Sequence, residues 1–202
     1  MKIPNNYNKD TALGGERIQP GGHKCVIKQV EETRSSTGKA MLVVSFDTAA
    51  EDIQPGYFAN RWFSDTRDDK KWQGNMYIVL EGEYADANLN RFLGAVDHSN
   101  EGFELNPGAD LDPKVFKNLK VGVVFREEDY TAWDGQARTS VKPFRWCAYD
   151  KAPEQKIPDR KAQKTDLASL EATTPAGVPA NASYGFVDVP ADADETEGLP
   201  FA

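Results

Sequence analysis

Two apolar runs rich in β-branched residues lie close together near the start of the chain. The run HKCVIKQVEE (residues 23–32) is followed by the polar segment TRSSTGK, and that segment is followed by AMLVVSFDTA (residues 40–49). In the second run Leu42, Val44 and Phe46 occupy alternate positions, which is the period of a strand with one buried face. The pair predicts a β-hairpin with a long basic loop, so the chain is expected to fold around a sheet.

Three later segments also read as strands. Residues 56–64 (GYFANRWFS) form an aromatic run that predicts a third strand. Residues 119–130 (LKVGVVFREEDY) and 138–149 (RTSVKPFRWCAY) predict the last two, and Asp134-Gly135 between them is a hairpin turn signal. The count therefore predicts five strands.

A helical insert is expected between the third strand and the last two. The segment MYIVLEGEY leads into a helix whose apolar positions follow helical spacing: Leu89, Phe92, Leu93 and Val96. A second short helix is expected to begin at Asp112, which can cap exposed N–H groups, with Pro113 at the first helical position. This order predicts an all-β fold, a five-stranded OB-type barrel with a short helical insert. Periodicity alone does not separate an OB barrel from another small β-barrel.

The charge of the chain is unevenly distributed. Residues 1–150 carry 19 basic and 23 acidic side chains, residues 151–164 carry five and two, and residues 165–202 carry none and seven. An acidic segment with few core-forming residues cannot offset its ordering entropy, so a disordered acidic C-terminal tail is expected. We divide the chain into four parts: a loose N-terminal arm (1–20), the OB-type domain (21–150), a linker (151–187) and an acidic partner-binding tail (188–202).

Composition also limits the classes of function. No apolar run approaches the roughly 20 residues that span a bilayer. We therefore expect no membrane contact. Two cysteines, Cys25 and Cys147, are too few for a disulfide framework, so we expect a cytoplasmic location. His23 and Cys25 share a strand face, but no paired metal-ligand spacing or nucleophile motif is present. We therefore expect no metal, no cofactor and no catalytic site, and interpret the protein as a non-enzyme.

Aromatic side chains alternate with Lys and Arg on several predicted strands and loops. Unstacked bases need flat apolar faces and phosphates need cations, so this pattern is typical of single-strand binding. The candidate nucleic-acid-binding residues are Lys28, Arg34, Lys39, Tyr57, Arg61, Trp62, Lys71, Trp72, Arg126, Tyr130, Trp133, Arg138, Lys142 and Arg145. The residues expected in the core are Phe58, Phe63, Phe125 and Phe144. Trp72 and Trp133, in polar loops, are expected to be exposed, while Trp62 and Trp146 are left open.

The segments 23–49, 56–72, 116–130 and 140–149 together resemble the single-stranded-DNA-binding proteins of bacteriophages, which have an OB fold. The end of the chain, DADETEGLPFA, is similar to the acidic tail of bacterial single-stranded-DNA-binding proteins, which finishes in Pro-Phe. That resemblance implies that Leu199, Pro200 and Phe201 dock replication or recombination proteins. Ala202 departs from the pattern, because it separates Phe201 from the terminal carboxylate.

Two functions from different classes remain. The first is sequence-tolerant binding of single-stranded DNA in phage replication or recombination, in the cytoplasm of a bacterial host, with the tip recruiting partners. The second is a β-barrel adaptor between proteins, or a virion structural module, that binds no nucleic acid. A tail that serves only solubility needs no apolar tip, so Leu199 and Phe201 favour the first. The choice between DNA and RNA and the presence of a homo-oligomer stay open.

Overall fold

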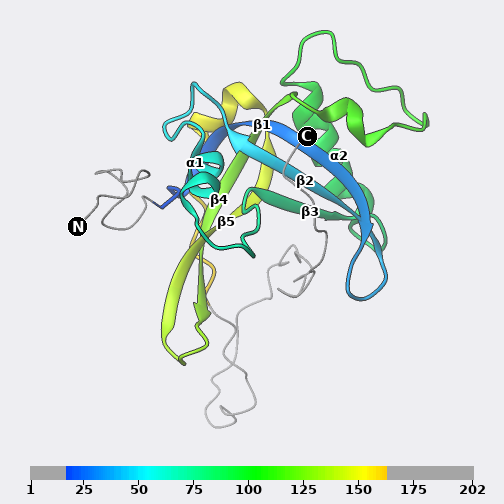
Figure 1. Cartoon of the computed structure of the whole chain (residues 1–202). Coiled ribbons are helices and arrows are strands. Elements are labelled where there is room, and N and C mark those ends of the chain that lie inside the picture. Colours follow the sequence, from blue (N-terminus) through cyan, green and yellow to red (C-terminus); the bar gives the residue numbers. More distant parts are fainter. Residues whose placement is uncertain (1–16, 163–202) are drawn as a thin grey trace, which may run out of the picture.

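The computed structural model describes residues 17–162, which form one curved sheet with short helices around it (Figure 1). The expectations for residues 1–16 and for the acidic tail lie outside the described residues. Five strands form the sheet, in the order β3-β2-β1-β4-β5, with every neighbouring pair antiparallel. Their bounds are β1 Gly21–Arg34, β2 Ala40–Thr48, β3 Asn75–Val79, β4 Lys120–Thr131 and β5 Ala137–Cys147.

Strand β1 is the central strand of the sheet, with β2 and β3 on one side and β4 and β5 on the other. Its first residues pair with β4, from Gly21 opposite Phe125 onward, and its later residues pair with β2 as far as Arg34 opposite Ala40. The register against β2 shifts between Ile27 and Gln29. A bulge of this kind bends a strand and increases its twist, so β1 curls the sheet around its inner face.

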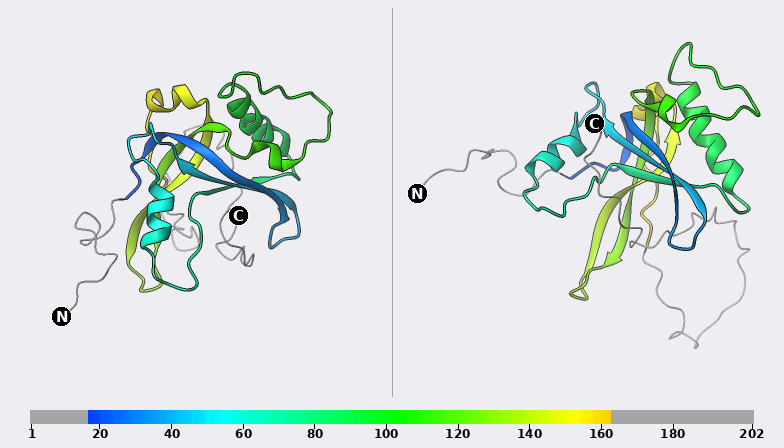
Figure 2. Two further views of the ribbon diagram at one scale, coloured as in Figure 1. Left: turned by 45° about the horizontal axis from the view of Figure 1, so that its top comes forward. Right: turned by 45° about the vertical axis from the view of Figure 1, so that its right-hand side comes forward.

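The helices are α1 Tyr57–Ser64, α2 Ala85–Asp97 and two 3₁₀ turns, η1 Pro113–Phe116 and η2 Tyr149–Glu154. The prediction of α2 is confirmed, with Phe92 and Val96 buried. The short helix at Asp112 is confirmed as η1, where the Asp112 side chain accepts a hydrogen bond from Lys114 N–H. Helix α2 begins near the β1–β2 end of the sheet, where Leu80 N–H donates to Ala40 O at 2.8 Å, and Figure 2 shows it away from the β4–β5 hairpin tip.

The expected strand over residues 56–64 is wrong, because this segment is α1 and the third strand is β3. Side chains of strand β2, and not of α1 itself, stabilise the start of α1. Tyr57 N–H donates to Thr48 Oγ1 at 2.8 Å, and Phe58 N–H donates to Asp47 Oδ1 at 2.9 Å. Both acceptors belong to β2, so the sheet itself caps two of the free N–H groups that begin a helix.

Aromatic rings fill the inside of the curved sheet. Phe46 is fully buried and packs edge-on against Phe58, Phe125 and Trp146, with ring centroids 5.7, 6.2 and 5.9 Å away. Phe92 carries the cluster on to α2 through Trp146, at 5.0 Å. Such edge-to-face pairs stabilise a core beyond the area they bury.

The folded part extends past both ends of the domain expected from the sequence. Ile18, expected in the N-terminal arm, is buried in the core, and the Gln54 side chain holds the backbone of Arg17 and Gln19. Residues 151–162, expected in the linker, lie against the sheet. Lys161 N–H donates to Glu127 O and Lys161 O accepts from Asp129 N–H, both at 2.9 Å, which adds a parallel bridge to the edge of β4.

Candidate nucleic-acid interface

The tip of the β4–β5 hairpin holds one aromatic side chain almost entirely in water. Trp133 is 97% exposed. Gly135 N–H donates to Ala132 O, and Gly135 adopts a φ of 76°, which completes a three-residue hairpin loop. The predicted turn at Asp134-Gly135 is confirmed, and it presents Trp133 at the point of the hairpin.

Tyr130 and Arg138 lie directly below this tip. They face each other across the hairpin, and Tyr130 is 41% exposed. The Arg138 guanidinium is paired with the Asp134 carboxylate in the turn. The charge of Arg138 is therefore partly balanced, but its side chain is half-exposed and lies opposite Tyr130.

Further along the hairpin the cations differ in their partners. Arg126 pairs with Glu128 at 2.7 Å and is largely buried. Lys142, opposite Arg126, and Arg145 are exposed, and neither has an acidic partner within 4 Å among residues 17–162. Lys142 and Arg145 are therefore the hairpin cations with the least compensated charge.

Arg34, the last residue of β1, and Lys39 in the β1–β2 loop are both exposed. Arg34 donates to Gly38 O at 2.9 Å, so its guanidinium helps to shape the loop that follows it. Lys28 lies at the bulge of β1 and is half-buried. The β1–β2 and β4–β5 tips project toward the same side of the molecule and stand apart from each other (Figures 1 and 2).

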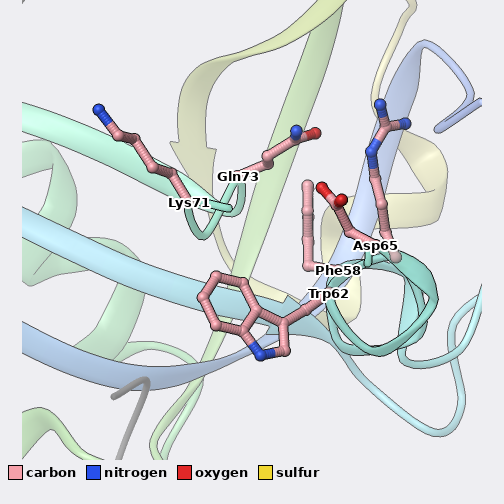
Figure 3. Close-up of a pocket in the computed structure, with 6 residues that line it drawn as sticks. Phe58, Trp62, Asp65, Lys71 and Gln73 are labelled. Carbon is pink, nitrogen blue, oxygen red and sulfur yellow. The ribbon is translucent and has the colours of Figure 1, made fainter. Parts of the chain in front are cut away.

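A third group gathers around α1 and the following loop. The rings of Trp62 and Trp72 lie 6.2 Å apart, and Arg61 donates to Tyr57 Oη at 3.2 Å. Trp62 and Lys71 line a small pocket with Phe58, Asp65 and Gln73, and Lys71 points away from the indole of Trp62 (Figure 3). The pocket volume is about 10 Å³, the space of one water molecule, so no base fits inside it.

The acidic member of this pocket is already engaged. Hydrogen bonds from the side chain and the backbone of Arg67 hold the pKa of Asp65 at about 2. Lys70 lies 4.8 Å over the ring of Trp62 and donates to Trp62 O and Asp65 O at 3.2 Å. The Trp62 ring thus already contacts a cation on one face.

Several burial predictions need correction. Trp72 was expected to be exposed, but it packs against the core and its Nε1 donates to Phe46 O at 3.2 Å and to Gly74 O at 3.3 Å. Phe63, expected in the core, is 78% exposed on α1. Phe144, also expected in the core, is half-buried under the Arg126 guanidinium, 4.0 Å from its ring centroid.

Phe58 and Phe125 are confirmed as core residues, and Trp146, left open by the sequence, is buried. Trp62 is half-buried. The candidate residues therefore form three separate groups, at the β4–β5 hairpin, at the β1–β2 loop and around α1. Of the two tryptophans expected to contact bases from polar loops, Trp133 has its ring free in solvent.

Sequence reasoning missed residues that follow the last strand. Lys156 and Ile157 line a groove with Arg126, Phe144 and Arg145. The segment containing them carries an excess of positive charge, which is visible in the sequence. Its position against β4 depends on a long-range backbone bridge, and no local pattern announces that bridge.

The residues weighed for metal binding serve the core instead. His23 is fully buried and pairs with Asp52, and Cys25 is buried with its pKa raised by burial and by nearby carboxylates. Within residues 17–162 no group of three or more His, Cys, Asp or Glu side chains is placed to hold a metal ion. No helix in the same range is long and apolar enough to cross a membrane.

No known family model matches the sequence, and no curated protein matches it.

Proposed function

We propose that this protein binds single-stranded DNA with little sequence preference and acts in phage DNA replication or recombination. The observation that carries the proposal is Trp133, 97% exposed at the tip of a hairpin that also carries Tyr130 and Arg138. An indole in water contributes little to folding, but it offers a face on which a base can stack. Stacking of this kind is worth about 1–3 kcal/mol per base and tolerates every base.

The strand order supports an OB-type fold as part of this proposal. An OB barrel is a partly open five-stranded barrel whose ligand face is flanked by the loops between strands 1 and 2 and between strands 4 and 5. Here β1 pairs with both β2 and β4, Arg34 lies at the start of the first of these loops, and Trp133 lies in the second. A single DNA strand bound on that face would contact both hairpin tips.

The tail supplies the second half of the proposed function. We propose that Leu199, Pro200 and Phe201 insert into a pocket on a replication or recombination protein. Seven acidic residues lie before this tip, between residues 165 and 198. Acidic groups of this density steer an encounter toward a basic surface and raise the association rate.

A salt series with labelled oligo-dT and with duplex DNA of equal length tests the DNA-binding proposal. We expect tighter binding to oligo-dT and an affinity that falls with salt, with a log–log slope of about −0.7 for each phosphate contacted. Tryptophan fluorescence is expected to quench as Trp133 stacks on a base. Equal or tighter binding to the duplex would contradict the proposal.

The alternative, a protein–protein adaptor, is supported by a different observation. Ile53 and Phe63 are 69% and 78% exposed. Large exposed apolar side chains can mark a docking surface. An adaptor of this kind would show no binding to oligo-dT at any salt concentration, and Phe63→Ser would weaken its partner binding.

A further inference from the structure

The outer side of the β4–β5 hairpin carries a groove that is distinct from the hairpin tip. Two opposing walls form it: Arg126, Phe144 and Arg145 lie on the strands, and Lys156, Ile157 and Asp159 lie on the segment that follows η2. Its volume is about 340 Å³, within the range of small-molecule sites. The groove is therefore large enough for a nucleotide.

The fold builds both walls of this groove. The register between β4 and β5 shifts so that Val124 faces Arg145 and Phe125 faces Pro143, which leaves Phe144 as the extra residue of a bulge. Bulges re-aim side chains in this way. The second wall is held in place by the bridge between Lys161 and β4, and Ile157 lies next to Gly21 at the start of β1.

The groove has an excess of positive charge. Arg126, Arg145 and Lys156 contribute three cations to its lining, against the carboxylate of Asp159 in the lining and that of Glu128, which pairs with Arg126. Arg145 is held by a neutral partner, since its Nη2 donates to Gln155 Oε1 at 3.1 Å. Lys156 is exposed and has no acidic partner within 4 Å in the part of the chain that the structure describes. The charges of Arg145 and Lys156 thus remain available to an anion.

Arg126 adds an unmet hydrogen-bond donor. Its guanidinium stacks on Phe144, and its Nη2 is satisfied by Glu128. Its Nε is buried and has no hydrogen-bond partner among residues 17–162. A buried donor on a charged group is costly to leave unpaired, so an acceptor oxygen supplied by a ligand would improve this site.

We infer that this groove binds a phosphate group of a nucleotide, with Arg126, Arg145 and Lys156 as its cations and with Ile157 against the sugar or base. Guanidinium groups match the geometry of phosphate oxygens, and they hold phosphate better than isolated ammonium groups do. The source of the phosphate is the backbone of a DNA strand that runs from Trp133 along the hairpin. The claim that DNA supplies the phosphate rests on the proposed function. The claim that the groove binds a phosphate group does not.

The test uses the full chain and two double variants. Arg145→Gln/Lys156→Gln removes two exposed cations from the groove. Lys114→Gln/Lys151→Gln removes two exposed cations outside its lining, of which Lys151 is paired with Glu154, and serves as a control for net charge. For a salt series with oligo-dT, we expect the log–log slope to flatten by about 0.7 in the groove variant, the loss of one phosphate contact, and to stay unchanged in the control. Equal flattening in both variants overturns the inference, because the effect is then one of net charge.

A second measurement separates the source of the phosphate from the site itself. Backbone amide signals of residues 144–145 and 156–159 are followed by NMR during titration with 5′-dTMP, inorganic phosphate and thymidine. We expect dTMP and phosphate to shift these signals in the wild type and not in the groove variant, and thymidine to leave them unchanged. No shift in the wild type with either phosphate compound overturns the site.

The two measurements together also keep this inference apart from the proposed function. Shifts with dTMP but no change of slope overturn the DNA strand as the ligand and assign the groove to a free nucleotide. Shifts with dTMP in a protein that fails to bind oligo-dT overturn the proposed function and leave the phosphate site standing.

Discussion

His23 and Asp52 form a hydrogen bond that is sealed from solvent, with Nδ1 2.8 Å from Oδ2 and the side chains 1% and 3% exposed. The other ring nitrogen of His23 lies 2.9 Å from Gln19 O. Both ring nitrogens of His23 therefore have an oxygen within hydrogen-bonding distance. The pair joins the first strand to the segment that leads into α1.

Asp52→Asn is expected to lower the free energy of unfolding by about 3 kcal/mol at pH 7, because it replaces a buried carboxylate that accepts hydrogen bonds from His23, Lys24 and Gln54. Burial alone raises the pKa of Asp52, but hydrogen bonds from the His23 ring and from the N–H groups of Gln54 and Lys24 outweigh it and lower the pKa. The stabilisation is therefore present above the unfolded value of about 3.9 and is lost as the pH falls through the folded-state pKa. Urea denaturation from pH 7 downward measures this.

In that series the stabilities of wild type and Asp52→Asn should converge at the acidic end. A constant difference down to the lowest pH at which both fold would show that the carboxylate charge is not what stabilises the pair.

Trp133→Ala is expected to weaken oligo-dT binding by about 1–3 kcal/mol through the loss of one stacking platform. The free energy of unfolding should not change, because this side chain is 97% exposed. Fluorescence anisotropy and urea denaturation on the same sample measure the two quantities.

Trp72→Ala serves as the contrasting variant. This indole packs on the core and donates to two backbone carbonyls, so its removal should destabilise the fold by about 2–4 kcal/mol. A Trp72 variant that is fully stable but binds DNA poorly would return Trp72 to the DNA-contacting surface and contradict its role in the core.

Gly22→Ala is expected to displace η2 from the sheet. A Cβ at Gly22 would lie 1.8 Å from Ala152 O and 2.7 Å from Ala152 C, so the backbone of η2 would have to move. Gly94→Ala is the matched control, since a Cβ there meets nothing within 4 Å and Ala favours a helix by about 1 kcal/mol. Thermal denaturation should show a lower Tm for the first variant and a higher Tm for the second. A Gly22→Ala variant as stable as the wild type would contradict the packing of η2.

Phe201→Ala is expected to abolish pull-down of the replication or recombination partner and to leave oligo-dT binding intact. Deletion of residues 188–202 should raise DNA affinity, most at low salt, because an acidic segment on the same chain competes with phosphate at high effective concentration. A lower Tm for Phe201→Ala would show instead that the tip packs on its own domain.

The sequence pattern predicted an element correctly where the groups that stabilise it are close together in sequence. The hairpin of residues 23–49, the face of α2 and the cap at Asp112 were all predicted, because alternation, helical spacing and a capping carboxylate act within a few residues. The turn at Asp134-Gly135 belongs to the same class. Because Trp133 lies next to this turn in a polar loop, the sequence also predicted that Trp133 is exposed.

Long-range partners account for the errors. The segment GYFANRWFS has the composition of a strand, but its helix is capped by Asp47 and Thr48, eleven and nine residues before the N–H groups that they accept from. Trp72 has charged and polar neighbours in sequence, yet its Nε1 reaches Phe46 O, 26 residues earlier. The groove beside Phe144 was missed for the same reason, because its second wall is placed by Lys161.

The sharing of β1 between the two halves of the sheet also sets the order in which the chain can fold during synthesis. Strands β1, β2 and β3 are the first three of the strands that the structure describes, so they can pair once residue 79 is free of the ribosome. The first residues of β1 must wait for β4, because Gly21 pairs with Phe125. At about 5–20 residues per second, the 46 residues that separate Val79 from Phe125 take roughly 2–9 seconds to make. For that interval the nascent chain carries an open strand edge, whose unpaired N–H and C=O groups can pair with another chain.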